Sequence, residues 1–186
     1  IVDRAPFLRG QGELVRRPVD VAPVERRTEA LRRALLVVGS LDQPPDKQHA
    51  GDDAASIARA IGRAGFEVVI AAGRRDLDAA HGGGLRVDEA LDDPAALSRL
   101  IRTGGFTLLH YVGHSGAESG ADPMGARAIT LEIGGFTQDL ALGELASACR
   151  DGHLRCAVFS ACDLRAHAAD ELLCIGGLEH VLTMGA

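Results

Sequence analysis

The stretch Phe106–Gly116, FTLLHYVGHSG, carries a run of strand-forming residues into a histidine and a serine flanked by glycines. The apolar residues at its start predict a buried strand, and the glycines predict that this strand ends near Val112. His114 and Ser115 then follow the strand directly. In open parallel sheets the reactive groups gather just beyond the strand ends, so these two residues are the first candidates for chemistry.

Strand and helix patterns alternate around this stretch. Apolar runs predict four further buried strands, at residues 34–38, 66–71, 155–160 and 180–183. Helical spacing and terminal signals predict helices at residues 52–64, 93–102, 142–150 and 164–173. A small hairpin around Gly134-Gly135, with strands at residues 128–133 and 136–137, is expected between the third and fourth strands. This order predicts an α/β fold in which a mostly parallel sheet is flanked by helices.

The chain divides into an arm and a domain. Residues 1–33 are rich in arginine and contain prolines that interrupt regular structure, so we expect an N-terminal arm or linker there. Residues 34–186 are expected to form one domain, with an irregular loop at 39–51 because of Pro44-Pro45. The chain stops directly after an apolar run, so we expect this domain to be truncated at its C-terminus.

Composition excludes several classes of protein. The chain has 186 residues, a net charge of −6, no Trp and one Tyr, which argues against a nucleic-acid binder. No apolar run approaches the roughly 20 residues that cross a bilayer, and no signal peptide is evident, so we expect a cytoplasmic protein without a membrane partner. The four cysteines never form a C-x-x-C pair and are expected to be free thiols.

Ser115 is one candidate nucleophile. Residues 113–117 nearly spell G-x-S-x-G, with Ala117 in place of the last glycine. That motif requires a helix directly after the serine, because the sharp strand-to-helix turn exposes the hydroxyl. Loop-forming residues follow here instead. An α/β serine hydrolase that uses Ser115 is therefore the weaker alternative.

Cys162 is the candidate nucleophile for which His114 could act as the base. It lies 48 residues downstream of His114, just past the fourth strand. About 50 residues separate the same pair in caspases. If the third and fourth strands are neighbours, their ends lie about 5 Å apart, and the imidazole can activate the thiol. Backbone amides of Ser115, Gly116 and Cys162 itself are candidates for an oxyanion hole.

The same residues resemble a known family. The stretches FTLLHYVGHSG, AITLEIGGFTQDLALGELASA and LRCAVFSACD, and the earlier AGDDAASIARAIGRAGFEVVIA, are similar to the CHAT family of caspase- and separase-related cysteine peptidases of clan CD. The resemblance covers residues 34–186. It implies a caspase-like domain that cleaves peptide bonds, with His114 as base and Cys162 as nucleophile.

The sequence thus predicts a cysteine endopeptidase that acts on a protein or peptide, without metal or organic cofactor. Asp42 and Asp163 are candidate substrate-binding acids near the expected cleft. We also expect regulation by other domains or by a partner protein. The alternative is an inactive caspase-like binding or scaffold module, because Ser115 stands where the family has glycine and no glycine closely follows Cys162.

Overall fold

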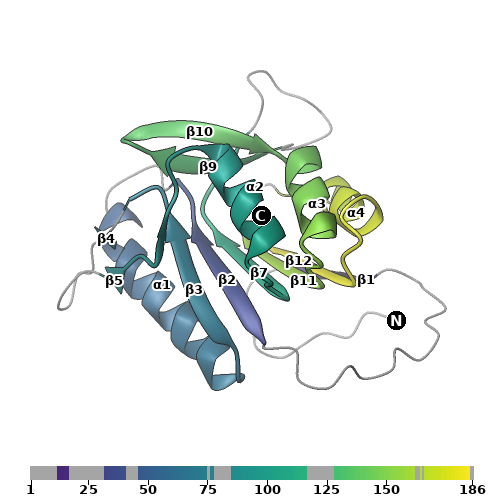
Figure 1. Ribbon diagram of the computed structural model, residues 1–186, viewed down its shortest axis with the longest axis horizontal. Coiled ribbons are helices and arrows are strands. Elements are labelled where there is room, and N and C mark those ends of the chain that lie inside the picture. Colours follow the sequence, from purple (N-terminus) through teal and green to yellow (C-terminus); the bar gives the residue numbers. More distant parts are fainter. Residues whose placement is uncertain are drawn as a thin grey trace.

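The computed structural model describes residues 12–16, 32–40, 46–74, 76–77, 85–116, 128–161, 164 and 166–184. Its centre is a seven-stranded sheet with the strand order β1-β12-β11-β7-β2-β3-β6 (Figure 1). The strands are β1 (Gly12–Arg16), β2 (Arg33–Val38), β3 (Glu67–Ala72), β6 (Glu89–Ala90), β7 (Leu108–Val112), β11 (Cys156–Ser160) and β12 (His180–Met184). The six strands from β12 to β6 are all parallel, whereas β1 pairs antiparallel with β12.

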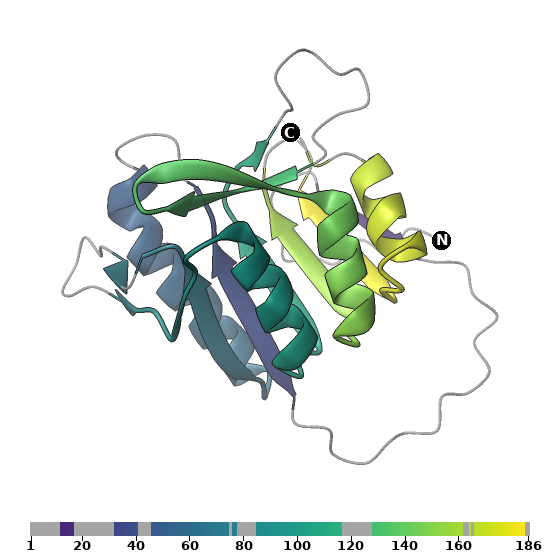
Figure 2. The same cartoon turned by 45° about the horizontal axis from the view of Figure 1, so that its top comes forward.

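Helices cover both faces of this sheet, as predicted for an α/β fold (Figures 1 and 2). The helices are α1 (Asp46–Arg63), α2 (Pro94–Thr103), α3 (Leu142–Asp151) and α4 (Ala166–Cys174). One face, here called the α2–α4 face, forms the larger core, in which Leu109, Phe159 and Val181 pack against those three helices. The opposite α1 face carries Leu36 and Ile70 against α1. Both faces of the central strands are therefore apolar, which explains their continuous apolar runs.

The helix boundaries follow local chemistry, with one difference from expectation. Asp93 caps α2 by accepting a hydrogen bond from the Ala96 amide at 2.5 Å, and Pro94 is the first helical residue. Helix α1, however, begins at Asp46 and not near residue 52. The expectation of a loop up to residue 51 was wrong because a proline immediately before a helix is compatible with its first turn.

The N-terminal arm contributes a strand that the sequence analysis did not predict. Strand β1 pairs along its whole length with β12, with Arg16 opposite His180 and Gly12 opposite Met184. The prolines of the arm argued against regular structure, and the pairing depends on a partner more than 160 residues away, which local sequence does not reveal. The arm therefore includes an edge strand of the sheet.

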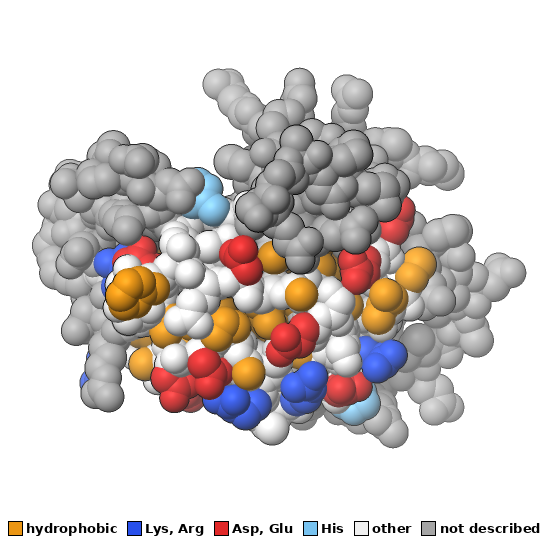
Figure 3. Space-filling view, turned by 90° about the horizontal axis from the view of Figure 1, so that it is seen from above, with side chains coloured by type: hydrophobic (Ala, Val, Ile, Leu, Met, Phe, Trp, Pro, Cys, Tyr) orange, Lys and Arg blue, Asp and Glu red, His pale blue; other side chains and the backbone are white. Residues whose placement is uncertain are grey.

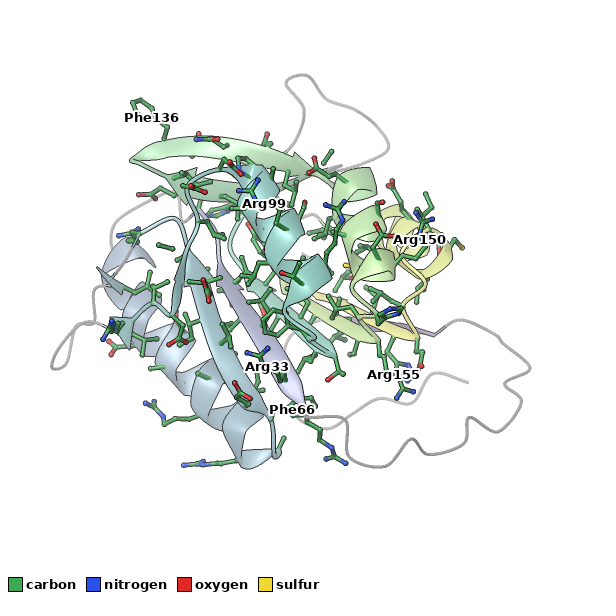
Figure 4. All side chains as sticks on the ribbon, in the orientation of Figure 1. Arg33, Phe66, Arg99, Phe136, Arg150 and Arg155 are labelled. Carbon is green, nitrogen blue, oxygen red and sulfur yellow. The ribbon has the colours of Figure 1, made fainter. Side chains whose placement is uncertain are left out.

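A second, three-stranded sheet lies across the end of the first. Strand β9 (Ala128–Ile133) and β10 (Phe136–Ala141) pair antiparallel around Gly134-Gly135, and β8 (Ser115–Gly116) pairs with the other side of β9. This sheet runs along the edge at which the parallel strands end, here called the carboxyl edge (Figures 1 and 2). Phe136 projects from the far end of β10 (Figure 4).

Short elements complete the described part of the chain. Strands β4 (Asp76–Leu77) and β5 (Leu85–Arg86) pair antiparallel with each other. None of the helices in the described ranges is sufficiently long and apolar to cross a bilayer.

The packing predicts a clear difference between two phenylalanines. Phe159 is fully buried on the α2–α4 face, with its ring centroid 6.2 Å from that of Tyr111, whereas Phe136 is 75% exposed. Phe159→Ala should lower the free energy of unfolding by roughly 3–5 kcal/mol, because it leaves a cavity in the core. Phe136→Ala, the matched control, should change it by less than about 1 kcal/mol. Denaturant unfolding measures both, and equal effects would contradict this placement of the core.

Candidate active site

His114 follows β7 at the carboxyl edge, where hydrogen bonds from two other segments fix its backbone. Its amide donates to the Ser40 carbonyl at 3.0 Å, and its carbonyl accepts from the Thr130 amide at 3.0 Å. Ser40 follows β2, and Thr130 belongs to β9. The histidine backbone is thus held between the end of a central strand and the hairpin that crosses it.

Tyr111 reinforces this anchor from inside the core. Its hydroxyl oxygen lies 2.6 Å from the His114 carbonyl oxygen and 2.7 Å from that of Thr130, so two acceptors share one hydrogen. The side chain is fully buried, and burial raises the pKa of Tyr111 above its ordinary value. The hydroxyl therefore stays protonated and remains a donor.

Two glycines make room for the tyrosine hydroxyl. A Cβ at Gly39 would meet the Tyr111 hydroxyl and would lie 2.5 Å from the Thr130 carbonyl oxygen. A Cβ at Gly113 would lie 2.7 Å from the same hydroxyl and 3.1 Å from the Gly39 Cα. The close approach of these backbones to Tyr111 thus requires residues without side chains.

The third and fourth strands of the predicted sheet, β7 and β11, are neighbours, as the sequence argument required. They are parallel, with Val112 opposite Ser160, and the Gly113 amide donates to the Ser160 carbonyl at 3.2 Å. Positions 114 and 162 each lie two residues beyond this last pair. The predicted nucleophile Cys162 and the predicted substrate-binding residues Asp42 and Asp163 lie outside the described residues.

Ser115 and Gly116 form β8 opposite Ile129 and Ala128. In the described part of the chain, the sole residue other than glycine with a left-handed φ is His153, so Ser115 does not have the strained turn of a nucleophile elbow. This geometry disfavours the serine alternative. Ser115 therefore does not adopt a left-handed conformation that would strain its side chain.

A second histidine lies lower on β7. His110 Nε2 is 3.0 Å from Ser160 Oγ on β11, so a side-chain hydrogen bond joins the two strands. Burial lowers the pKa of His110 from 6.5 to about 4, so its imidazole is neutral at physiological pH.

Three of the four cysteines are free thiols in different surroundings. Cys149 is fully buried in α3, and burial raises its pKa to about 12. Cys156 in β11 is half-buried, and its pKa is raised first by burial and then by the charge of Glu179. Cys174 is exposed at the end of α4. These three provide internal standards for the reactivity of Cys162.

The sequence did not predict the residues that anchor His114. Tyr111, Ser40 and Thr130 come from three segments, and the contacts of Thr130 with the other residues exist only once β9 lies on the carboxyl edge. The one available signal was the chain's single tyrosine, inside an otherwise aliphatic strand.

Figure 3 looks onto the β9–β10 side, where acidic and apolar side chains are interspersed and arginines lie toward one border.

Comparison with known protein families finds no matching family model, and comparison with curated proteins finds no significant match. The function of this chain is therefore inferred from its own residues and geometry.

The glycine at residue 39 provides a test of the anchor. Gly39→Ala should lower the free energy of unfolding by roughly 1–3 kcal/mol, because the new methyl group meets a buried hydroxyl and a backbone carbonyl. Gly62→Ala in α1 is the matched control: a Cβ there meets nothing within 4 Å, and the change should stabilise the helix by up to about 1 kcal/mol. Denaturant unfolding distinguishes them, and a neutral Gly39→Ala would contradict the close approach.

The buried imidazole predicts a specific pH dependence. Because the pKa of His110 falls from 6.5 to about 4 on folding, the unfolded chain takes up this proton first. The contribution of neutral His110 to the free energy of unfolding is complete above pH 6.5 and is lost as the pH falls toward 4. The difference in free energy of unfolding between the natural chain and His110→Gln should therefore shrink over that range. The other titratable groups are the same in both chains, so their pH dependence cancels in this difference. A difference that does not vary with pH would contradict the burial of His110.

Proposed function

We propose that this chain is a caspase-like cysteine endopeptidase domain in which Cys162 is the nucleophile and His114 is the general base. The observation that carries the proposal is the pairing of β7 with β11, with Val112 opposite Ser160. The two candidate residues follow the paired ends at equal distances along the chain. Neighbouring parallel strands lie about 4.8 Å apart, so we infer that the imidazole and the thiol that follow these paired ends come within reach of each other.

The anchoring of His114 supports the same role. A general base must keep its position while it exchanges a proton. The backbone of His114 is held by Ser40, Tyr111 and Thr130, whereas its side chain is half-buried at the carboxyl edge. A backbone that is fixed on the protein side, with a side chain that retains access to solvent, suits a catalytic imidazole.

The proposed reaction is an acyl transfer in two steps. The His114 imidazole takes the Cys162 thiol proton, and the thiolate attacks the carbonyl carbon of the scissile peptide bond. Backbone amides of Ser115, Gly116 and Cys162 would stabilise the oxyanion that forms. The imidazolium then gives its proton to the leaving amine, and water hydrolyses the thioester, which returns the free thiol.

Substrate and context are part of this proposal. The substrate is a protein or peptide, and Asp42 and Asp163 would favour a basic side chain near the scissile bond. The chain would act in the cytoplasm under the control of other domains or a regulatory protein. A caspase-like scaffold agrees with the parallel sheet, its helices on both faces and the strand order around β7 and β11.

Thiol labelling tests the proposal. With iodoacetamide at mildly acidic pH, Cys162 should react ahead of Cys149, Cys156 and Cys174, and mass spectrometry can follow each site. His114→Ala should slow the labelling of Cys162 by roughly tenfold, because an unactivated thiol is only a few per cent thiolate at neutral pH. Ser115→Ala, the control, should leave the rate within about twofold.

A peptidyl acyloxymethyl ketone extends the test to the reaction itself, because it labels thiols that attack a bound carbonyl group. Labelling of Cys162 that depends on His114 supports a peptidase. Equal reactivity of all four thiols, with no ketone adduct, would overturn it in favour of an inactive binding module. Loss of ketone labelling in Ser115→Ala, with Cys162→Ala still labelled, would instead indicate a serine hydrolase.

A further inference from the structure

Strand β10 forms one edge of the three-stranded sheet, and no strand lies beside its outer edge in the described part of the chain. Its pairing with β9 is continuous from Phe136 to Ala141, without a bulge. The strand contains neither lysine nor proline, the residues that commonly prevent another strand from pairing with an edge. The outer edge of β10 is therefore open to an additional strand.

The turn of the hairpin determines which backbone groups of β10 point outward. Its two glycines have φ values of 60° and 84°, as a two-residue type I′ turn requires. In such a hairpin the flanking residues, Ile133 and Phe136, form a hydrogen-bonded pair, and bonded pairs then alternate with non-bonded pairs. The amides and carbonyls of Thr137 and Asp139 therefore point away from β9. Among the described residues, no backbone hydrogen bond uses these groups.

The side chains beside this edge indicate the chemistry of a partner. Leu140 is buried in the core of the α2–α4 face, whereas Thr137 and Asp139 are exposed on the other side of the hairpin. Asp139 is the charged residue of β10, and it accepts a hydrogen bond from the Thr130 hydroxyl at 2.7 Å, which holds its carboxylate. Phe136 is 75% exposed and extends from the end of β10 (Figure 4). An apolar ring and a carboxylate thus lie three residues apart along the open edge.

The surrounding surface favours a positively charged partner. Acidic side chains lie among apolar ones on the β9–β10 side, and the arginines lie toward one border (Figure 3). The whole chain has a net charge of −6. A basic segment is attracted to such a surface, whereas a second copy of the chain carries the same charge and is repelled.

We propose that β10 binds an extended basic segment of a partner protein as an added antiparallel strand. Two residues of the segment, separated by one, would pair through their backbones with Asp139 and Thr137. A lysine or arginine opposite Asp139 would meet its carboxylate, and an apolar residue three positions later would lie opposite Phe136. The inference goes beyond the proposed peptidase activity and does not depend on it.

Fluorescence anisotropy with the labelled, capped peptide Thr-Lys-Val-Thr-Phe-Thr tests the proposal. Antiparallel pairing places its lysine opposite Asp139 and its phenylalanine opposite Phe136. Asp139→Asn and Phe136→Ala should each weaken binding by about two- to fivefold, which is the range of single cross-strand pairs. Glu67→Gln, at an exposed site where β3 begins, is the matched control and should leave binding unchanged. Equal effects of Asp139→Asn and Glu67→Gln would overturn the proposed register.

Backbone methylation of the peptide distinguishes an added strand from contacts of side chains alone. The amides of its lysine and of the threonine before phenylalanine would point to β10, so methylation of both should abolish binding. The amides of its valine and phenylalanine would point away from β10, so their methylation should leave binding within about fivefold. Equal losses from the two methylated peptides would overturn the added strand.

Thr137→Pro tests the same edge from the side of the protein. Proline removes an amide that points outward and leaves the donors of the β9–β10 pairing in place. This variant should lose peptide binding, whereas Thr137→Val keeps the amide and should bind within about twofold of the natural chain. Denaturant unfolding checks that both variants fold, and the methylated peptides decide the question if Thr137→Pro does not.

Two results with folded protein would overturn the proposal. One is unchanged peptide binding by Thr137→Pro. The other is a dimer of the natural chain, seen by sedimentation equilibrium, that dissociates in Thr137→Pro while the peptide does not bind the natural chain. In that case β10 would pair with a second copy and not with a basic partner.

Discussion

The Tyr111 hydroxyl joins parts of the chain that are distant in sequence. One hydroxyl hydrogen is shared by the carbonyl of His114, just beyond the end of the same strand, and that of Thr130, in the hairpin. The Ser40 backbone adds bonds to both residues from the end of β2. An unpaired buried carbonyl costs free energy, so these bonds together determine where β9 lies on the sheet. The position of His114 depends on that arrangement.

The parallel sheet supplies the other constraint. The parallel strands all end at one edge of the sheet. Because neighbouring strands are close together, residues that are far apart in the sequence meet at this edge. Here β7 and β11 are adjacent, and the His110–Ser160 bond crosses between them on the α1 face. The opposite face is closed by α2, α3 and α4, so their packing stabilises the scaffold beneath the candidate site.

These two constraints position different parts of the proposed active site. Hydrogen bonds on the hairpin side fix the backbone of His114, and the His110–Ser160 hydrogen bond joins β7 to β11 on the α1 face. A peptidase needs both, because a thiol is activated only when base and sulfur keep a defined geometry. Ser115, in β8, takes no part in a strained turn, which agrees with a role for its backbone and not its hydroxyl.

The sequence by itself determined the α/β class, the parallel sheet and most helix positions, because continuous apolar runs and caps such as Asp93 act locally. The hypothesis of a His114–Cys162 pair required the strands before these residues to be neighbours, and the structure pairs β7 with β11. The sequence analysis missed strand β1, the early start of α1 and the Tyr111 anchor. Strand β1 and the Tyr111 anchor depend on contacts between distant segments: β1 needs β12 beside it, and the Tyr111 hydroxyl acquires the Thr130 carbonyl as its second acceptor only when β9 crosses the carboxyl edge. Local propensity carries no information about such partners, so only the tertiary structure could decide them.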